Sequence, residues 1–384
     1  MKSNPRIFIS AGEPSGDLHA ASLVRAIKAA RPGAEFAALG GNAMESAGAA
    51  LIHNMLGQFA VMGFIDALRV LPAIRRLRDE TLTFLDGWKP DAAVLVDYPG
   101  FNLNLAYHLK ERGIRVFYYI CPQVWAWAPG RIRKIAARVD KALVVFPFEA
   151  DLYRHGGIPV EYVGHPLGDV FAARPLDREF VERGPLAGAK LLVALLPGSR
   201  TREIRVSFPV KAEAALIIKA EHPGATFAVP VTTVEHARIV EGIAKSAGLD
   251  CTVLVEKAYE VMSLASFAIT TSGTATLELA HFGVPMVVLY RTNPGGLFVK
   301  KFFIRTEDIA LVNIVAGRRI VPELVYWLNH ARTIARMSLE VLDDAARLEA
   351  MSKDVRAAGA LIDSPGASKR AAAAILGGLD SEKA

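Results

Sequence analysis

Cysteine and long apolar segments are what this sequence has least of. Cys121 and Cys251 are the only cysteines among 384 residues, which excludes a disulfide framework and a zinc cluster built on thiolates. No stretch approaches the ~18 consecutive apolar residues of a membrane-spanning helix. The N-terminal MKSNPRIFISAGEPSGD lacks the apolar segment and cleavage site of a secretory signal. We therefore expect a cytoplasmic protein, for which peripheral contact with a membrane stays open.

Several common catalytic signatures are also missing. The chain contains no GxGxxG or GxxxxGK loop, no DxD and no GxSxG turn. The first two absences argue against the common glycine-rich nucleotide-binding loops, the third removes a metal–nucleotide signature, and the fourth argues against a serine hydrolase of the nucleophile-elbow type. No two of the nine histidines have the spacing of a helical metal pair. We expect neither a cofactor nor a metal ion. The formal net charge of +6 favours anionic small molecules or an anionic membrane surface over nucleic acid.

Short apolar runs alternate with longer helical patterns along most of the chain. The expected strands are residues 6–10, 35–39, 92–96, 115–120, 141–145, 160–163, 191–196, 226–229, 252–255, 267–270 and 285–289. The expected helices include residues 17–30, 101–112, 203–221 and 274–282, and from residue 322 onward the pattern is helical. Alternation of this kind predicts an α/β fold with parallel sheets and right-handed crossovers.

The alternation pauses over residues 164–188, which are rich in proline, glycine and charge. The fold class expected is therefore α/β, with two doubly wound Rossmann-like domains facing a central cleft. Residues 1–168 would form the first domain and residues 186–330 the second. Residues 331–384 would add C-terminal helices, which could pack back on the first domain.

Two strand-to-helix turns in the second half could bind phosphate. In LPGSRTREI (196–204), backbone N–H groups and Arg200 would form an anion cradle, whereas the alternative is a turn with a surface arginine. In TTSGTATLELA (270–280), Ser272, Gly273 and Thr274 offer hydroxyl and N–H groups at a helix start. Glu278 could accept both hydroxyls of a ribose, or it could be a solvated residue of a capped helix. Taken together, the two turns favour a nucleotide diphosphate.

Three segments of the first half could form part of a site. AGEPSGD (11–17) is best interpreted by itself as a strand–helix turn in which Ser15 or Asp17 caps the helix. Asp97 ends a strongly apolar strand, where partial burial would tune a carboxylate toward general-base catalysis; the alternative is a helix cap. CPQVWAW (121–127) carries two tryptophans, which could pack in the core or form a sugar-stacking wall.

Residues 59–78 are predicted to form a membrane-docking patch. The apolar run FAVMGFI leads into a helix whose expected core stripe is Val70, Ile74, Leu77 and Phe84. The apolar residues of the patch itself, beside several arginines and with no acidic residue between 69 and 78, are Met62, Phe64, Leu68 and Leu71. Apolar groups ringed by arginine suit the headgroup layer of an anionic leaflet. The alternative is a helix covered by a neighbouring loop.

An ordered series of motifs runs through the chain. The first half contains AGEPSGD (11–17), GGxxMxxAG (40–48), AVMGF (60–64), DxPxFN (97–102), PxVWAW (122–127), FPFE (146–149) and GHP (164–166). The second half contains LPGSR (196–200), SGTATLE (272–278), PMVVxYR (285–291) and NxxAGR (313–318). The series resembles the lipid-A-disaccharide synthase family, bacterial glycosyltransferases that join two acylated glucosamines, over nearly the whole chain.

The resemblance implies a GT-B fold, inverting transfer without a metal in the chemical step, and lipid A biosynthesis at the cytoplasmic face of the inner membrane. The donor would be UDP-2,3-diacylglucosamine and the acceptor 2,3-diacylglucosamine 1-phosphate. Matched by motif, Asp97 corresponds to the catalytic carboxylate. UDP contacts would come from Arg200, Ser272, Gly273, Thr274 and Glu278, acceptor contacts from Ser15, Gly16 and Asp17, and the cleft lining from Asn313 and Arg318. The chain departs from the family at DYPGFN (97–102), where DAPDFN is frequent, and at residues 325–327.

Two other functions remain as alternatives at this point. A UDP-sugar epimerase of the same fold would need carboxylates able to act on both faces of one sugar, and it would have no use for an acyl-chain surface. A two-lobed solute-binding protein would need the signal peptide that the sequence lacks. The oligomeric state and the preferred acyl-chain length do not follow from the sequence.

Overall fold

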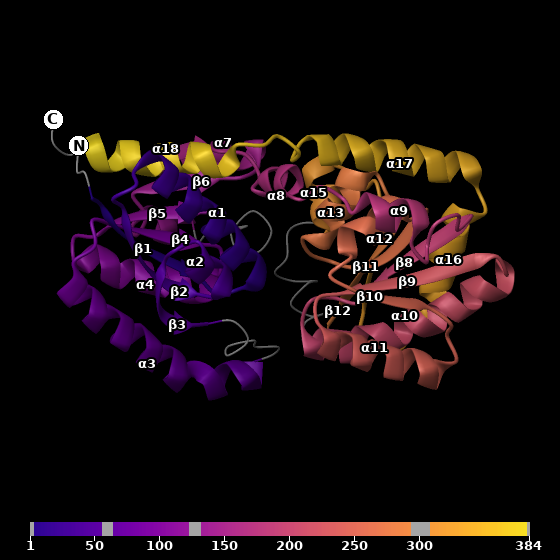
Figure 1. Cartoon of the computed structure of the whole chain (residues 1–384). Helices are drawn as coiled ribbons and strands as arrows, with labels where there is room; N and C mark the ends of the chain where they lie inside the picture. The colour runs from indigo at the N-terminus through magenta and orange to yellow at the C-terminus, as the bar shows by residue number, and fades with distance from the viewer. Residues whose placement is uncertain (1–3, 56–63, 123–131, 293–307, 382–384) are drawn as a thin grey trace. The chain divides into compact units, whose positions relative to one another are not determined.

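The computed structural model describes residues 4–55, 64–122, 132–292 and 308–381, with the side chains of residues 64–70 left out (Figure 1). The chain divides into two compact units. The first unit consists of Met1–Val170 together with Ser364–Ala384, and the second consists of Phe171–Asp363. The C-terminal stretch is therefore shared, because residues 331–363 belong to the second unit and the last 21 residues to the first.

Within the described residues, the first unit is built on a seven-stranded parallel sheet with the strand order β3-β2-β1-β4-β5-β6-β7. Its strands are β1 (Arg6–Ala11), β2 (Glu35–Gly40), β3 (Ala50–Asn54), β4 (Ala92–Val96), β5 (Arg115–Tyr119), β6 (Lys141–Val144) and β7 (Val160–Tyr162). Its helices are α1 (Pro14–Ala30), α2 (Asn42–Ser46), α3 (Phe64–Trp88), α4 (Pro99–Glu111), α6 (Ile132–Ala136), α7 (Pro147–His155), the first part of α8 (Leu167–Ala173) and α18 (Ala367–Asp380).

The described part of the second unit contains a six-stranded parallel sheet with the order β10-β9-β8-β11-β12-β13. Its strands are β8 (Leu191–Leu196), β9 (Ala225–Val231), β10 (Thr252–Val255), β11 (Phe267–Thr271), β12 (Met286–Arg291) and β13 (Glu323–Tyr326). Its helices are α9 (Arg178–Arg183), α10 (Thr201–Glu221), α11 (Val234–Ala247), α12 (Ala258–Leu264), α13 (Ala275–Phe282), α15 (Leu311–Ala316), α16 (Ala331–Leu342) and α17 (Ala345–Ala360).

The central strands are apolar along their whole length because helices cover both faces of each sheet. All five residues of β4 are buried, as are the last five of β8. In each sheet the strand order reverses beside the first strand of the unit, between β1 and β4 and between β8 and β11. Ligands of such sheets bind beyond the carboxyl ends of the strands at this reversal. The turns after β1, β4, β8 and β11 are therefore the expected ligand-binding positions. The expected α/β class with two parallel sheets is confirmed.

The chain returns to the first unit at its C-terminus. In Figure 1, α18 lies alongside α1, and the two helices pack together. The carboxylate of Asp169 accepts hydrogen bonds from the backbone N–H groups of Gly366 and Ser368, at the start of α18. At the far end of the helix, Asp380 pairs with Arg31, the residue that follows α1, at 2.7 Å. Both ends of α18 are thus fixed to residues of the N-terminal part of the chain.

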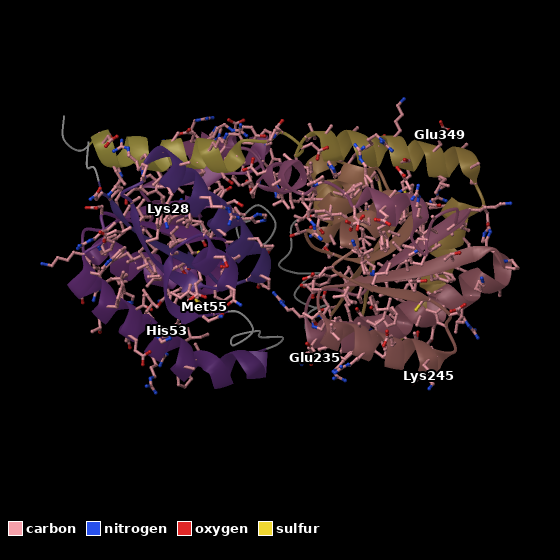
Figure 2. The ribbon with its side chains drawn as sticks, in the orientation of Figure 1. Lys28, His53, Met55, Glu235, Lys245 and Glu349 are labelled. Carbon is pink, nitrogen blue, oxygen red and sulfur yellow. The ribbon has the colours of Figure 1, made fainter. Side chains whose placement is uncertain are left out.

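The β2–β3 edge of the first sheet is tied to neighbouring helices by residues labelled in Figure 2. Lys28 Nζ donates to the carbonyl of Gly48 over 2.8 Å, and the ring of His53 lies 3.2 Å from the carboxylate of Glu80 on α3. Met55, directly after β3, is buried in the core of the unit. These contacts hold a short edge strand that the sequence analysis did not predict.

Two of the expected elements are wrong in detail. Residues 322 onward do not begin as helix, because Glu323–Tyr326 form the edge strand β13 before α16 starts. In α3 the predicted core stripe is confirmed at Leu77, which is buried, and at Ile74, which packs against the core, but it is wrong at Phe84, which is 41% exposed. Beyond Leu77 the buried face of α3 continues through Thr81 and Leu85, so Phe84 lies at the edge of this face.

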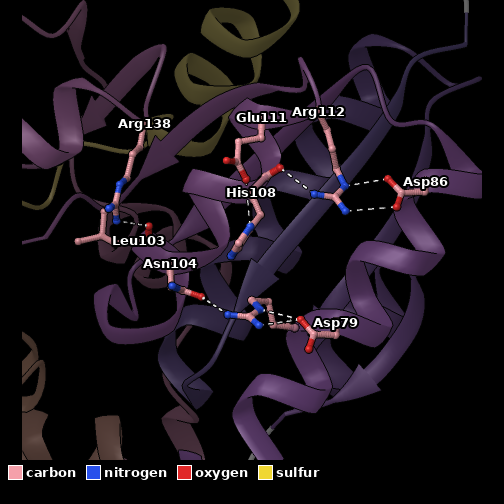
Figure 3. Close-up of polar contacts among 9 residues, drawn as sticks. Asp79, Asp86, Leu103, Asn104, His108, Glu111, Arg112 and Arg138 are labelled. Atoms are coloured by element: carbon pink, nitrogen blue, oxygen red, sulfur yellow. Dashed lines mark hydrogen bonds and ion pairs between the residues drawn. The ribbon is translucent and has the colours of Figure 1, made fainter.

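Helix α3 is also fastened to α4 by polar contacts (Figure 3). Asp86 receives two hydrogen bonds from the guanidinium of Arg112, at 2.7 and 3.3 Å. Arg78 donates to the side-chain oxygen of Asn104 at 3.2 Å and pairs with Asp79. These bonds fix the C-terminal part of α3 in place and define which of its faces is left toward solvent.

Candidate active site

The turns after β1 and β4 meet at the carboxyl edge of the first sheet. Gly12 follows β1, and the ring of Tyr98 occupies the place of its missing side chain: a β-carbon at Gly12 would lie 2.3 Å from Tyr98 Cδ1. Asp97 and Tyr98 both have left-handed backbone conformations, with φ values of 44° and 49°. Such a turn is strained for residues other than glycine, and strain of this kind concentrates at functional sites.

Asp97 is the titratable group that this turn presents. Burial and, to a smaller extent, the nearby carboxylate of Glu13 raise the pKa of its carboxyl from 3.8 to about 6, against a hydrogen bond from the Tyr98 backbone N–H. A carboxyl with this pKa is ionised at neutral pH, but it binds a proton more readily than an ordinary aspartate. That combination is suited to a general base.

A buried amide holds the Asp97 turn in its conformation. Asn102, on α4, donates its side-chain N–H groups to the carbonyls of Asp97 (2.7 Å) and Val96 (3.2 Å), and it accepts a hydrogen bond from the Ser10 hydroxyl at 2.7 Å. The Tyr118 hydroxyl donates to the same Asp97 carbonyl at 2.8 Å. The sequence analysis did not identify these residues as part of the site, although Asn102 is the last residue of the DxPxFN motif.

Asp17 belongs to the group of residues expected to contact the acceptor. Its side chain is 2% exposed, and its carboxylate accepts backbone N–H groups of Gly41, Ala43 and Met44, at 2.9 to 3.3 Å. It therefore caps helix α2, which is not the helix that contains it. Its oxygens are committed to the GGxxM segment, and a contact between Asp17 and the acceptor stays a prediction.

The other two residues of that expected group lie in the first turn of α1. Gly16 is buried, and a β-carbon there would lie 3.5 Å from the Ala11 side chain. Ser15 is half-buried. Of the two, only Ser15 has a polar side chain with exposed surface close to the β1 turn.

The turn after β8 brings an arginine and a carboxylate together. Arg200 is the half-buried residue that precedes α10, with extended backbone. Gly198 has a φ of 105°, and a β-carbon there would lie 2.3 Å from the carboxyl group of Glu203. The Ser199 N–H donates to Glu203 Oε2 at 3.3 Å. The turn thus already accommodates one anionic group, as a phosphate-binding turn would.

The turn after β11 has the second set of expected donor contacts. Gly273 has a φ of 151°, and Thr274 immediately precedes α13. The Ser272 hydroxyl donates to the carbonyl of Ile309 at 3.1 Å. Ser272, Gly273 and Thr274 are all half-buried. This turn and that of Arg200 follow adjacent strands, so they lie at the same edge of the second sheet.

Glu278 lies one turn into α13, where its carboxylate accepts the hydroxyl hydrogen of Tyr259 at 3.2 Å. Burial raises the pKa of Glu278, whereas the Tyr259 hydrogen bond and the charge of Arg174 oppose the rise. The guanidinium of Arg174 lies 5.1 Å from the centre of the Tyr259 ring. Tyr259 therefore orients a carboxylate that the sequence analysis treated as either a ribose ligand or a solvated group.

The side chains of Asn313 and Arg318 contact residues outside the two donor turns. Asn313 has no exposed surface: its side-chain oxygen accepts the N–H groups of Ile320 and Val321, and its amide donates to Glu323 at 2.6 Å. Arg318 is 62% exposed and pairs with Asp354 of α17 at 2.7 Å. The Asn313 side chain is therefore committed to partners within its own segment, and the expectation that this segment lines a cleft stays a prediction.

Asn313 nevertheless acts on the donor turn through its partner. The carboxylate of Glu323 accepts the backbone N–H groups of Ile309 (2.8 Å) and Ala310 (2.9 Å). The carbonyl of Ile309 is in turn the acceptor of the Ser272 hydroxyl. Asn313 is thus a residue that holds the scaffold to which Ser272 is bound.

The predicted membrane patch is described only in part. Met62 lies outside the described residues, and the side chains of Phe64 and Leu68 are not described. Leu71 is 38% exposed on α3. The tryptophans of residues 121–127 also lie outside the description.

None of the described helices is long and apolar enough to cross a membrane. In the same part of the chain, no three His, Cys, Asp or Glu side chains are grouped so that they could hold a metal ion.

The two parallel sheets form a GT-B-like fold. UDP-GlcNAc 2-epimerase from Neisseria meningitidis, solved with UDP-GlcNAc bound, superposes with a TM-score of 0.64 over 97% of this chain and 99% of the epimerase, at 12% identity. Sucrose-phosphate synthase from Thermosynechococcus elongatus superposes with a TM-score of 0.58 over 98% of both chains, at 13% identity. At such low identity these likenesses show the fold alone.

Sequence comparison identifies the family. The family model described as lipid-A-disaccharide synthetase matches residues 7–375. The lipid-A-disaccharide synthase of Geobacter metallireducens is 38% identical over 374 residues, covering 97% of each chain, and that of Myxococcus xanthus is 36% identical over 377 residues, covering 98% of each. The chain belongs to the lipid-A-disaccharide synthase family, the glycosyltransferases of lipid A biosynthesis. The resemblance seen in the motifs is confirmed, and the two alternative functions gain no support.

Proposed function

We propose that the chain transfers a 2,3-diacylglucosaminyl group from UDP to the 6-hydroxyl of 2,3-diacylglucosamine 1-phosphate. The products are a β-1,6-linked disaccharide 1-phosphate and UDP. The observation that carries the proposal is the Asp97 turn, where a carboxyl with raised pKa stands at the strand reversal of the first sheet. In this assignment the first unit binds the acceptor and the second unit binds the donor.

Asp97 is the general base of the reaction. Its carboxylate takes the proton of the acceptor 6-hydroxyl while the hydroxyl oxygen forms a bond to C1 of the donor sugar. The bond between C1 and the phosphate oxygen breaks, and UDP leaves with the electron pair. Attack on the face opposite UDP inverts the configuration at C1. The raised pKa supports this role, because the carboxyl holds the proton more firmly than an ordinary aspartate would.

The donor is held by the turns after β8 and β11. Arg200 and the backbone N–H groups of its turn bind the diphosphate, supported by the presence of one carboxylate already in that turn. Ser272, Gly273 and Thr274 add contacts from the adjacent turn. Glu278, oriented by Tyr259, accepts hydroxyl hydrogens of the ribose.

The enzyme binds peripherally to the anionic cytoplasmic face of the inner membrane, where both lipid substrates are anchored. The docking patch consists of Met62, Phe64, Leu68 and Leu71. Its support lies in the exposed Leu71 and in the exposed arginines Arg75 and Arg76 that follow it on α3. Arg76 is partly neutralised by Glu80 at 2.7 Å, which leaves Arg75 as the stronger candidate for a lipid phosphate.

A two-substrate assay tests the proposal. The purified chain is supplied with UDP-2,3-diacylglucosamine, with and without the acylated acceptor, and free UDP and disaccharide are measured. Equal amounts of UDP and disaccharide, formed only when the acceptor is present, are expected. Formation of a C2 epimer from UDP-N-acetylglucosamine, without transfer, would instead assign the chain to the epimerases.

A further inference from the structure

A lysine with no exposed surface lies directly behind the turn assigned to the donor diphosphate. Lys211, on α10, donates from Nζ to the carbonyl of Leu196 at 2.6 Å and to the Ser207 hydroxyl at 3.4 Å. Among the described residues, no carboxylate is within ion-pair distance of it. Burying a charge without a paired charge costs free energy of folding, which indicates a role for Lys211 other than stabilising the fold.

Lys211 and Ser207 together fix the peptide bonds that open the turn. The Ser207 hydroxyl donates to the carbonyl of Pro197 at 2.8 Å, and Lys211 binds the preceding carbonyl, that of Leu196. Because a trans peptide is planar, its N–H points opposite to its C=O. The N–H of Gly198 is therefore directed away from α10, toward the outer side of the turn.

The elements packed against Lys211 bring few charged groups near it, and the carboxylate that acts on it lies at the turn. Glu203 is the carboxylate whose charge favours the protonated form of Lys211, and it lies at the turn against Gly198. The strands β8, β9 and β11 contain no charged residue. On α11, His236 bonds Thr201 and Thr232, and on β12, Arg291 donates to the Val206 carbonyl. The charged residues of α16 are exposed, and they are Arg332, Arg336 and Glu340.

We infer that Lys211 is a positioning residue of the donor site, which orients the turn after β8 and favours, through its buried charge, the binding of a nucleoside diphosphate there. The inference rests on the proposed function, since it takes this turn as the diphosphate site. Arg200 would touch the diphosphate directly, whereas Lys211 acts through the Leu196 and Pro197 carbonyls. The sequence analysis assigned no role to Lys211.

The arrangement couples diphosphate binding to proton uptake. Burial lowers the pKa of Lys211 to about 7, so only part of the molecules carry its charge just above neutral pH. A dianion bound at the turn raises that pKa. By linkage, a rise of one unit corresponds to about tenfold tighter binding at pH values where Lys211 is already protonated. The contribution of Lys211 to affinity is therefore largest below pH 7 and is lost as the pH rises through the pKa of the complex.

Calorimetric titration of the full chain with UDP tests the inference, between pH 6.0 and 9.0 and in buffers of different ionisation enthalpy. Lys211→Met removes the charge at nearly constant volume, and Lys211→Gln keeps a donor for the Leu196 carbonyl without the charge. Lys219→Met is the matched control, because Lys219 lies on the same helix and also donates to a backbone carbonyl, that of Ala225, but is exposed. Thermal unfolding of each variant is measured alongside.

The expected result is UDP binding that is about tenfold weaker for Lys211→Met at pH 6.5, with the difference from the native chain shrinking toward pH 9. Buffer-dependent proton uptake is lost, and the melting temperature is not lowered. The control binds UDP as the native chain does. Equal UDP affinity and equal proton uptake in the native, Met and Gln chains would overturn the inference. Failure of the native chain to bind UDP would instead overturn the donor site itself, and the inference with it.

Discussion

The ring of Tyr98 lies where a side chain on Gly12 would be, 2.3 Å from the position of a β-carbon. The two residues follow β1 and β4, the strands between which the order of the first sheet reverses. A glycine is therefore needed in one turn so that the aromatic residue of the other can close over it. The backbone of Asp97, immediately before Tyr98, depends on this fit.

We predict that Gly12→Ala lowers turnover because the added methyl group displaces Tyr98 and with it the Asp97 turn. The loss should exceed tenfold, since small misplacements of a reacting group cost about that much or more. Gly100→Ala is the control, because a β-carbon there meets no atom within 4 Å and the residue lies in the same turn region, on α4. Equal activity of both variants would show that Tyr98 does not position Asp97.

Asp97→Asn should reduce turnover by about 10²-fold or more, because the variant keeps the shape of the side chain but cannot accept the proton. In the native chain, kcat/KM should rise with pH to a plateau, with a midpoint at about 6, the pKa of the carboxyl. UDP affinity should hardly change. Near-native turnover in the variant would assign the proton transfer to another group, with Glu13 the nearest carboxylate.

The same substitution should stabilise the fold at neutral pH. In the folded chain the pKa of Asp97 is about 6, whereas in the unfolded chain it has the ordinary value of 3.8. Because the folded state binds the proton more tightly, protonation of Asp97 stabilises the fold below pH 3.8, and this stabilisation is lost as the pH rises to about 6. Above pH 6 the buried charge opposes folding. Asp97→Asn should therefore raise the melting temperature at pH 7.5, and the difference should vanish near pH 4.

Arg200→Ala should weaken UDP binding by about 10- to 100-fold, the value of one charge-assisted contact with a phosphate. Arg205→Ala is the control, since Arg205 is exposed on α10, the helix that Arg200 precedes. Binding of UDP is measured by calorimetry and folding by thermal melting. An unchanged UDP affinity in the Arg200 variant would remove this residue from the donor site.

Asp17→Ala should destabilise the first unit by about 2 kcal/mol or more, because it leaves buried N–H groups of α2 without an acceptor. Asp17→Asn keeps one side-chain oxygen and should lose less. Chemical unfolding gives both values. If stability were native and only the KM for the acceptor rose, Asp17 would be a substrate ligand and the capping role assigned here would be wrong.

Replacing Met62, Phe64, Leu68 and Leu71 together by serine should release the protein from anionic vesicles. Binding of the native chain should be strong at low salt and decline as salt rises, because arginine contacts with lipid are screened. Phe84→Ser, which alters an exposed aromatic residue elsewhere on α3, should leave vesicle binding intact. Activity on a short-chain acceptor should survive in both variants. Equal vesicle binding by the native and the fourfold variant would place membrane contact elsewhere.

The sequence was most informative where burial is complete. Strands such as β4 and β8 are continuous apolar runs, and the turns that follow them carried the predicted Asp97 and Arg200. The edge strand β13 is mostly half-buried, and its apolar residues 324–326 were assigned to the helical pattern of the C-terminal part. The local pattern therefore identified the central strands and one edge strand of each sheet, β7 and β10, and missed the opposite edge strands, β3 and β13.

Side-chain roles were harder to predict, because they depend on distant partners. Asp17 lies in a motif that could face a ligand, but its carboxylate accepts the backbone N–H groups of Gly41, Ala43 and Met44. The missing side chain of Gly40 makes room for Met44 beside it. Lys211 in an alanine-rich helix has the sequence environment of an exposed lysine. Only the fold shows that it points to the carbonyl of Leu196.

The capping of α18 by Asp169 has a consequence for how the protein is made. The first unit is built from two segments, one on the N-terminal and one on the C-terminal side of the second unit, whereas the second unit is one continuous segment, Phe171–Asp363. During translation the second unit can therefore complete its fold before the first, although its residues are synthesised later. A premature stop after residue 363 would spare the C-terminal sheet and leave α1 of the N-terminal unit uncovered.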